Sequence, residues 1–166
     1  MASSTRLRTF KWLSLAVIFV LLVLAGFTIV YRESIRHYRQ STFVEAALRG
    51  NVLRMRLLLA AGANIDQPAC ESFLCPPPIV AAAFNERSDG VRLLLDRGAN
   101  VNGRMQRGQT ALMIAAYQGR VDTVKLLLSR GADVNAESQG NTALEGAKQK
   151  SRSDIVEMLV NAGASR

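Results

Sequence analysis

Four segments of the chain end alike, and this internal repetition constrains the fold more than any other feature. Each segment closes on a leucine-rich stretch followed by a glycine, and the glycines lie 36, 33 and 32 residues apart, at Gly62, Gly98, Gly131 and Gly163. A second shared stretch precedes each ending, such as TALMIAAYQG over residues 110–119. This period is typical of solenoids, in which each repeat buries its apolar face only against its neighbours. The sequence therefore predicts a stack of four repeats over residues 41–166.

The repeats resemble the ankyrin repeat, whose pattern is roughly G-x-T-P-L-x-x-A-A-x-x-G, then V-x-x-L-L, then G-A-D-V-N. Residues 108–135 follow this pattern almost position by position, from Gly108 and Thr110 to Asp133 and Asn135. The resemblance covers about three quarters of the chain. It implies an all-α ankyrin-repeat solenoid of helix-turn-helix units with hairpin loops, with repeats at about 41–66, 76–102, 108–135 and 140–166.

Local chemistry predicts several helix boundaries in these repeats. Thr42 and Glu45 have the T-x-x-E spacing of a capping box, and Thr110 and Thr142 suit the same helix-start position. Pro78 suits the first turn of a helix, where a missing N–H costs nothing. The four repeat glycines suit helix ends because glycine accepts a left-handed backbone.

The net charge of +8 at pH 7 is unevenly distributed along the chain. Residues 1–39 carry six basic residues and one acidic residue, whereas residues 40–166 carry 15 basic and 12 acidic residues. The repeats are therefore nearly balanced, and their basic residues are not interleaved with aromatic ones. We therefore interpret the basic residues of the end repeats as polar caps of the solenoid rather than as a phosphate-binding stripe. We expect no nucleic-acid partner.

Residues 12–31 form an uncharged, apolar run of 20 residues, WLSLAVIFVLLVLAGFTIVY. A helix of that length spans roughly 30 Å, the thickness of the hydrocarbon core of a bilayer. The run predicts a single-pass transmembrane helix that acts as a signal anchor, between a basic tail (residues 1–11) and a juxtamembrane linker (residues 32–40). Cleavage after Ala25 would instead release a secreted ankyrin domain, but the apolar run continues six residues further, which favours an uncleaved anchor.

Both cysteines, Cys70 and Cys75, lie in one loop between the first and second repeats. Their spacing allows a small disulfide loop, which would indicate an oxidising compartment; two independent reduced thiols are the alternative. Together with the anchor, a disulfide favours a bacterial inner-membrane protein whose repeat domain lies in the periplasm.

The family resemblance also indicates where a protein partner binds, because ankyrin proteins usually bind through the hairpin tips and the exposed positions of the first helices. Carried over by position, the tips are residues 71–74, 104–107 and 137–139. The predicted partner-binding residues are Phe73, Leu74, Phe84, Arg104, Met105, Arg107, Met113, Tyr117, Gln118, Glu137 and Gln149. Several are of types enriched in interface hot spots. For Phe84 and Tyr117, covering the adjacent helix is an equally good explanation.

With one histidine, His37, and two cysteines, the chain has few residues for catalysis or metal binding. We expect no enzymatic activity, no cofactor, no metal and no small-molecule substrate. The leading hypothesis is a membrane-anchored protein-binding module, an accessory protein or an immunity or inhibitor protein at the bacterial envelope. A subunit of a membrane assembly that uses the transmembrane helix is the alternative, although this helix has neither a charge nor a Gly-x-x-x-Gly motif.

Overall fold

The structure is a computed structural model that describes residues 3–69 and 76–165, with side chains described from residue 20 onward. The described residues form eight α-helices and no strand, which confirms the predicted all-α class. The helices are α1 (Ser3–Leu48), α2 (Val52–Ala60), α3 (Pro78–Ala83), α4 (Asp89–Asp96), α5 (Ala111–Gln118), α6 (Val121–Ser129), α7 (Ala143–Gln149) and α8 (Ser153–Asn161). The chain divides into two units between Tyr38 and Arg39, so that α1 contributes to both.

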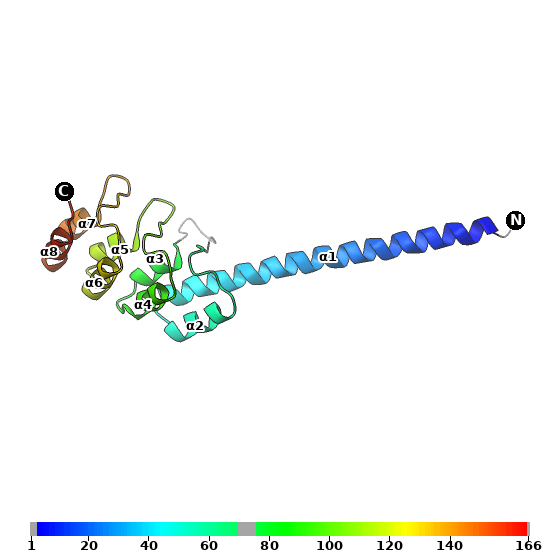
Figure 1. The fold of residues 1–166 in the computed structure, drawn as a ribbon, viewed down its shortest axis with the longest axis horizontal. Coiled ribbons are helices and arrows are strands. Elements are labelled where there is room, and N and C mark those ends of the chain that lie inside the picture. Colours follow the sequence, from blue (N-terminus) through cyan, green and yellow to red (C-terminus); the bar gives the residue numbers. More distant parts are fainter. Residues whose placement is uncertain (1–2, 70–75, 166) are drawn as a thin grey trace. The chain divides into compact units, whose positions relative to one another are not determined.

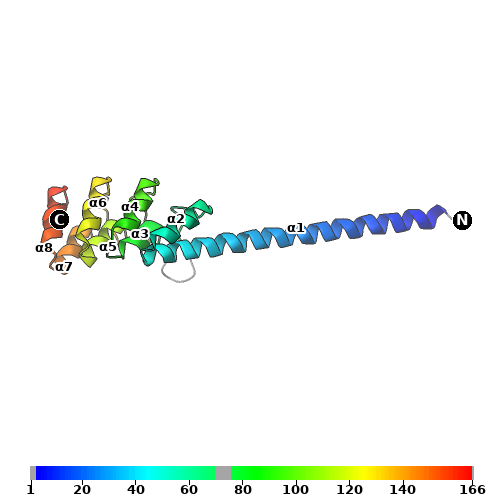
Figure 2. The ribbon, with the colours of Figure 1, turned by 90° about the horizontal axis from the view of Figure 1, so that it is seen from below.

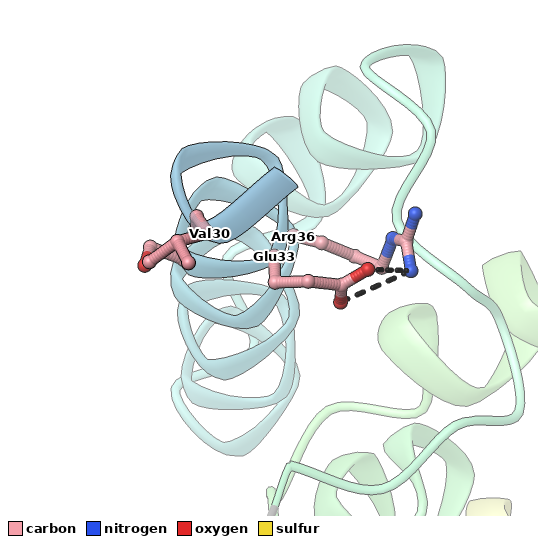
Figure 3. Close-up of polar contacts among 4 residues, drawn as sticks. Val30, Glu33 and Arg36 are labelled. Carbon is pink, nitrogen blue, oxygen red and sulfur yellow. Dashed lines mark hydrogen bonds and ion pairs between the residues drawn. The ribbon is translucent and has the colours of Figure 1, made fainter. Parts of the chain in front are cut away.

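The first unit consists of the part of α1 before Arg39. Large apolar side chains between Val20 and Tyr31 are exposed, and the ring of Phe27 stacks on that of Tyr31 with centroids 6.3 Å apart. Further along, Arg36 Nη1 donates to both carboxylate oxygens of Glu33, at 2.9 and 3.1 Å (Figure 3).

A membrane span receives no support from the described part of the chain, where no helix is both long enough and apolar enough to cross a bilayer. Residues 12–19 of the predicted span lie outside the described side chains. The transmembrane segment therefore stays a prediction. Residues 32–40, predicted as a linker, are helical and belong to α1.

The second unit stacks helix pairs side by side. Its first pair consists of residues 39–48 of α1 together with α2, and the pairs α3–α4, α5–α6 and α7–α8 follow. Figure 2 shows α3, α5 and α7 in one row and α2, α4, α6 and α8 in a second row. The loops that precede α5 and α7 project to the same side (Figure 1). Each pair packs on the next, with α5 between α3 and α7.

The core of this unit is a continuous band of small and branched apolar residues. Paired alanines in the first helices are almost fully buried: Ala46 and Ala47, Ala82 and Ala83, and Ala115 and Ala116. Their small side chains let neighbouring first helices approach closely. The second helices contribute larger buried side chains, among them Met55, Leu94, Leu127 and Leu159. Stacking therefore supplies the burial that a single pair cannot achieve.

Three of the predicted helix starts are confirmed and one is wrong. Thr110 Oγ1 accepts the Met113 N–H at the start of α5, and Thr142 begins α7. Pro78 is the first residue of α3. Thr42, in contrast, lies inside α1, where its hydroxyl donates to the carbonyl oxygen of Arg39 at 3.0 Å. The T-x-x-E spacing is present there, but the preceding residues continue the helix and leave no N-terminus to cap.

The repeat glycines follow the ends of the second helices, as predicted. Their φ angles are all positive: +88° at Gly62, +84° at Gly98, +78° at Gly131 and +92° at Gly163. After α4, the N–H of Gly98 bonds to the Leu95 carbonyl oxygen at 3.1 Å and that of Ala99 to the Leu94 carbonyl oxygen at 3.0 Å. This pattern satisfies the last carbonyls of the helix.

A chain of side-chain hydrogen bonds joins the turns that follow the second helices. In each case a side-chain oxygen of one turn accepts the backbone N–H of the next turn at 2.9 Å, in the pairs Asp66–Asn100, Asn102–Asp133 and Asn135–Ser165. Among the described residues, the first of these turns has no preceding turn to bond to, and Gln40 of α1 bonds to it instead. Its buried Oε1 accepts from the Asn64 N–H at 2.9 Å, and its Nε2 donates to the carbonyl oxygens of Asn64 and Gln67.

Candidate protein-binding groove

Two hairpin loops, residues 101–110 and 134–142, form one rim of the candidate site. In the second hairpin, Ser138 and Asn141 exchange both backbone hydrogen bonds at 2.9 Å. The two residues between them, Gln139 and Gly140, have φ angles of +52° and +78°. Positive φ at both central residues is the geometry of a type I′ turn, which matches the twist of a two-residue hairpin.

The two hairpins are held to each other by side chains. Ser138 Oγ donates to the Arg107 carbonyl oxygen at 2.7 Å. Arg104 Nη1 donates to the carbonyl oxygen of Glu137 at 3.1 Å and to that of Gly108 at 3.4 Å. The bonds to the Arg107 and Glu137 carbonyl oxygens join one repeat to the next, so the two hairpins are not independent loops.

The opposite side of the site consists of α5 and α7, whose starts are set by threonines. Thr142 and Glu145 form a complete capping box at α7: the threonine Oγ1 accepts the Glu145 N–H at 3.3 Å, and Glu145 Oε2 accepts the Thr142 N–H at 2.7 Å. Both threonines that cap these helices are buried. Each hairpin therefore passes into its helix at a defined position.

Between the hairpins and these helices lies a groove of about 640 Å³. Its lining residues are Phe84, Met105, Gln106, Arg107, Gln109, Met113, Ile114, Tyr117, Gln118, Ser138, Gln139, Asn141, Thr142, Gly146 and Gln149. Buried apolar residues contribute to this lining, with Met105 6% and Met113 8% exposed. Six of the lining side chains are carboxamides, and Arg107 is the one charged residue in the set.

Tyr117 of α5 packs against α7, the neighbouring helix on the same side of the groove. A Cβ placed on Gly146 would meet the Cβ of Tyr117 at 3.7 Å, which is ordinary van der Waals contact. The Nζ of Lys150 lies 4.6 Å from the centroid of the Tyr117 ring, a cation–π arrangement. Tyr117 covers the adjacent helix and is still 41% exposed, so its role in partner binding stays a prediction.

The structure brings together seven of the residues predicted for partner binding: Phe84, Met105, Arg107, Met113, Tyr117, Gln118 and Gln149 all line the groove. Met105 and Met113 do so as buried residues and not as exposed ones. Arg104 and Glu137 are outside the lining and bond to each other along the rim. Phe73, Leu74, Cys70 and Cys75 lie outside the described residues, so the predicted disulfide stays a prediction.

Several lining residues were not predicted from the sequence, notably Gln109, Ile114 and Asn141. Gln109 and Asn141 occupy the same place in successive repeats, directly before a capping threonine. That shared register is a signal that sequence analysis could have used, because a polar side chain recurring at one position of a solenoid recurs on one surface.

The comparisons with known proteins agree with this architecture. A family model described as "Ankyrin repeats (3 copies)" matches residues 78–165, which cover the helices from α3 to α8. The first helix pair lies ahead of the matched region. A search of the curated proteins finds no match to the chain.

Proposed function

This chain belongs to the ankyrin-repeat family, and from that premise we propose that it binds a segment of a protein partner in the groove between its hairpins and α5 and α7. Ankyrin repeats are protein-interaction modules and typically have no enzymatic activity. The observation that carries the proposal is the composition of the groove, whose lining combines buried methionines with six carboxamides.

The chemistry of this groove suits an extended peptide segment. A carboxamide both donates and accepts hydrogen bonds, so it can pair with the N–H and C=O groups of a peptide backbone without a charge requirement. Side chains of the bound segment would bury against Met105, Met113 and the ring of Tyr117. Aromatic and methionine side chains are enriched at the centres of protein interfaces.

The partner segment is expected to be neutral or acidic. Arg107 lines the groove, Lys150 lies at the Tyr117 ring, and the lining contains no carboxylate. The carboxylate of Glu145, on the adjacent helix, accepts the Thr142 N–H. A basic segment would therefore approach two cations without gaining an ion pair within the lining.

We also propose that the N-terminal region anchors the module in a membrane, with the repeats in the bacterial periplasm. The support is the uncharged run over residues 12–31, together with the exposure of the large apolar side chains in its described part, from Val20 to Tyr31. Exposed apolar surface of this extent is unfavourable in water and suited to lipid. Anchoring would raise the local concentration of the module beside an envelope partner, as an accessory or inhibitor protein requires.

Affinity purification of the full-length protein from membranes, followed by mass spectrometry, tests the groove. Tyr117→Ala removes the exposed ring, and loss of a hot-spot residue weakens binding by about tenfold or more. Lys125→Ala is the matched control, because Lys125 is an exposed residue of α6, in the other row of helices. A protein that is captured by wild type and by the control, and lost with Tyr117→Ala, identifies the partner. Equal capture by all three proteins would refute partner binding in the groove.

The anchor is tested separately, by alkaline extraction of membranes and by the mass of the isolated protein. Retention in the membrane with an intact N-terminus is the expected result. Release of a chain that begins after Ala25 would show a cleaved signal peptide instead.

A further inference from the structure

The second helix of the first pair exposes positions that are buried in the second and third pairs. Leu57 of α2 is 63% exposed, whereas Leu93 and Leu126 at the equivalent positions are each 7% exposed. Arg54 is exposed, whereas Gly90 and Thr123, its equivalents, are buried. These positions face the preceding pair: a Cβ on Gly90 would meet the Met55 sulfur of α2 at 3.6 Å. The first pair of the described solenoid has no such neighbour.

The start of α2 also departs from the pattern of the other second helices. The first turns of α4, α6 and α8 contain Asp89, Asp122 and Asp154, which complement the positive end of the helix dipole. The first turn of α2 contains no acidic residue, and the equivalent position is Leu53, which is 70% exposed. A leucine here neither stabilises the helix start nor packs in the core.

Leu53 and Leu57 are four residues apart and therefore lie on one face of α2. Arg54 and Arg56 flank them on either side, and neither forms an ion pair among the described residues. Arg49, in contrast, pairs with Glu45 at 2.7 Å. We call the surface formed by Leu53, Arg54, Arg56 and Leu57 the end face.

We propose that the end face contacts the surface of a bilayer that contains anionic phospholipids. Leucines flanked by arginines on a helix are the composition of segments that lie in the membrane interface, where the apolar side chains enter the headgroup boundary and the arginines bind lipid phosphates. Arg54 and Arg56 disfavour a second copy of the chain as the occupant, because two such faces would place like charges together. The inference rests on the proposed anchor, from which only residues 32–52 separate Leu53.

The contact would give the module a preferred orientation on the membrane. The anchor alone limits how far the repeats can lie from the bilayer. A second contact, through α2, would also restrict their rotation. Each arginine near an anionic surface strengthens such a contact about fivefold, and two arginines about 25-fold.

Hydrogen exchange of the full-length protein in lipid nanodiscs tests this contact. One protein molecule per disc is compared in phosphatidylcholine and in phosphatidylcholine mixed with phosphatidylserine. We expect slower exchange over residues 52–60 in the anionic discs, and no difference over α4 or α6. Arg54→Glu with Arg56→Glu should abolish the difference, whereas the matched pair Arg92→Glu and Arg97→Glu, exposed on or directly after α4, should leave it intact.

Leu53→Asp is a second variant, chosen so that misfolding would not explain its effect. It introduces the residue found at this position in the three later second helices, so the helix start should be as stable or more stable. The lipid-dependent difference in exchange should nevertheless fall, because the leucine is lost and a negative charge is added.

Four results would overturn the proposal. Exchange over residues 52–60 that is equal in the two lipids excludes an anionic-lipid contact. Protection that appears only with two protein molecules per disc indicates a second copy, and protection that requires an added protein indicates a protein partner. A protein that fails to enter the discs refutes the anchor and the lipid contact with it, whereas one that enters with unchanged exchange refutes the lipid contact alone.

Discussion

The same T-x-x-E motif occurs at two places in this chain, and loss of its threonine should lower the stability at only one of them. At the start of α7, Thr142 and Glu145 exchange two hydrogen bonds, at 3.3 and 2.7 Å. Thr142→Ala removes the bond to the Glu145 N–H and leaves a helix N-terminus with one more unsatisfied donor. Loss of a threonine cap costs about 1 kcal/mol, within a range of about 0.5–2 kcal/mol. We expect the free energy of unfolding to fall by that amount.

Thr42→Ala is the matched control, because Thr42 has Glu45 three residues later but lies within α1. Its hydroxyl bonds to the Arg39 carbonyl oxygen, a local bond that a helix interior does not need. Alanine is a better helix former than threonine by up to about 0.7 kcal/mol. We therefore expect Thr42→Ala to change stability by about 0.5 kcal/mol or less, in either direction.

The assay is urea unfolding of the full-length protein in detergent, followed by far-ultraviolet circular dichroism, with wild type and both variants measured together. The difference in unfolding free energy comes from the shift of the midpoint at an unchanged slope. Equal destabilisation by Thr142→Ala and Thr42→Ala would refute the reasoning, because it would mean that the motif acts without regard to where the helix begins.

Substitutions at three further positions test other parts of the solenoid by the same unfolding assay. Ser151 has a φ of +53° where the preceding repeat has a glycine, so Ser151→Gly should raise stability by about 0.5–1 kcal/mol; a loss would show that the strain is absent. Leu127 is fully buried, and Leu127→Ala should cost about 3–5 kcal/mol by leaving a cavity; a cost below about 1 kcal/mol would contradict tight packing of α6. Asn102 Oδ1 accepts the Asp133 N–H at 2.9 Å, so Asn102→Ala should cost about 1 kcal/mol, while Asn102→Asp keeps the acceptor and should be nearly neutral. Equal costs of the two Asn102 variants would show that this bond does not stabilise the stack.

Much of the solenoid could be predicted from the sequence because its signals are local. Gly98 ends a helix through the backbone freedom of glycine itself, and Pro78 begins one through its own fixed φ. Thr110 and Thr142 act over three residues of chain. Such interactions depend little on the rest of the molecule. The repeat pattern and its helix boundaries could therefore be predicted from the sequence.

The candidate site was only partly predictable. Tyr117 and Gln118 follow from their place in the repeat, and both line the groove. The burial of Met105 could not be predicted, since it depends on the tertiary packing of the hairpin that contains it. Arg104 was predicted for partner binding, but its guanidinium bonds to the Glu137 carbonyl oxygen 33 residues away.

The sequence by itself determined the repeat, its period and the ends of most helices, because glycine, proline and capping threonines act within a few residues of themselves. Only the tertiary structure decided whether a repeated residue is buried, and whether it caps a helix, in each pair of the stack. Leu57, Leu93 and Leu126 occupy the same position of the repeat, yet only Leu57 is exposed, because burial in a solenoid depends on having a neighbouring pair. Thr42 and Thr142 differ for a related reason: a cap requires a helix end, and the helix that contains Thr42 begins many residues earlier.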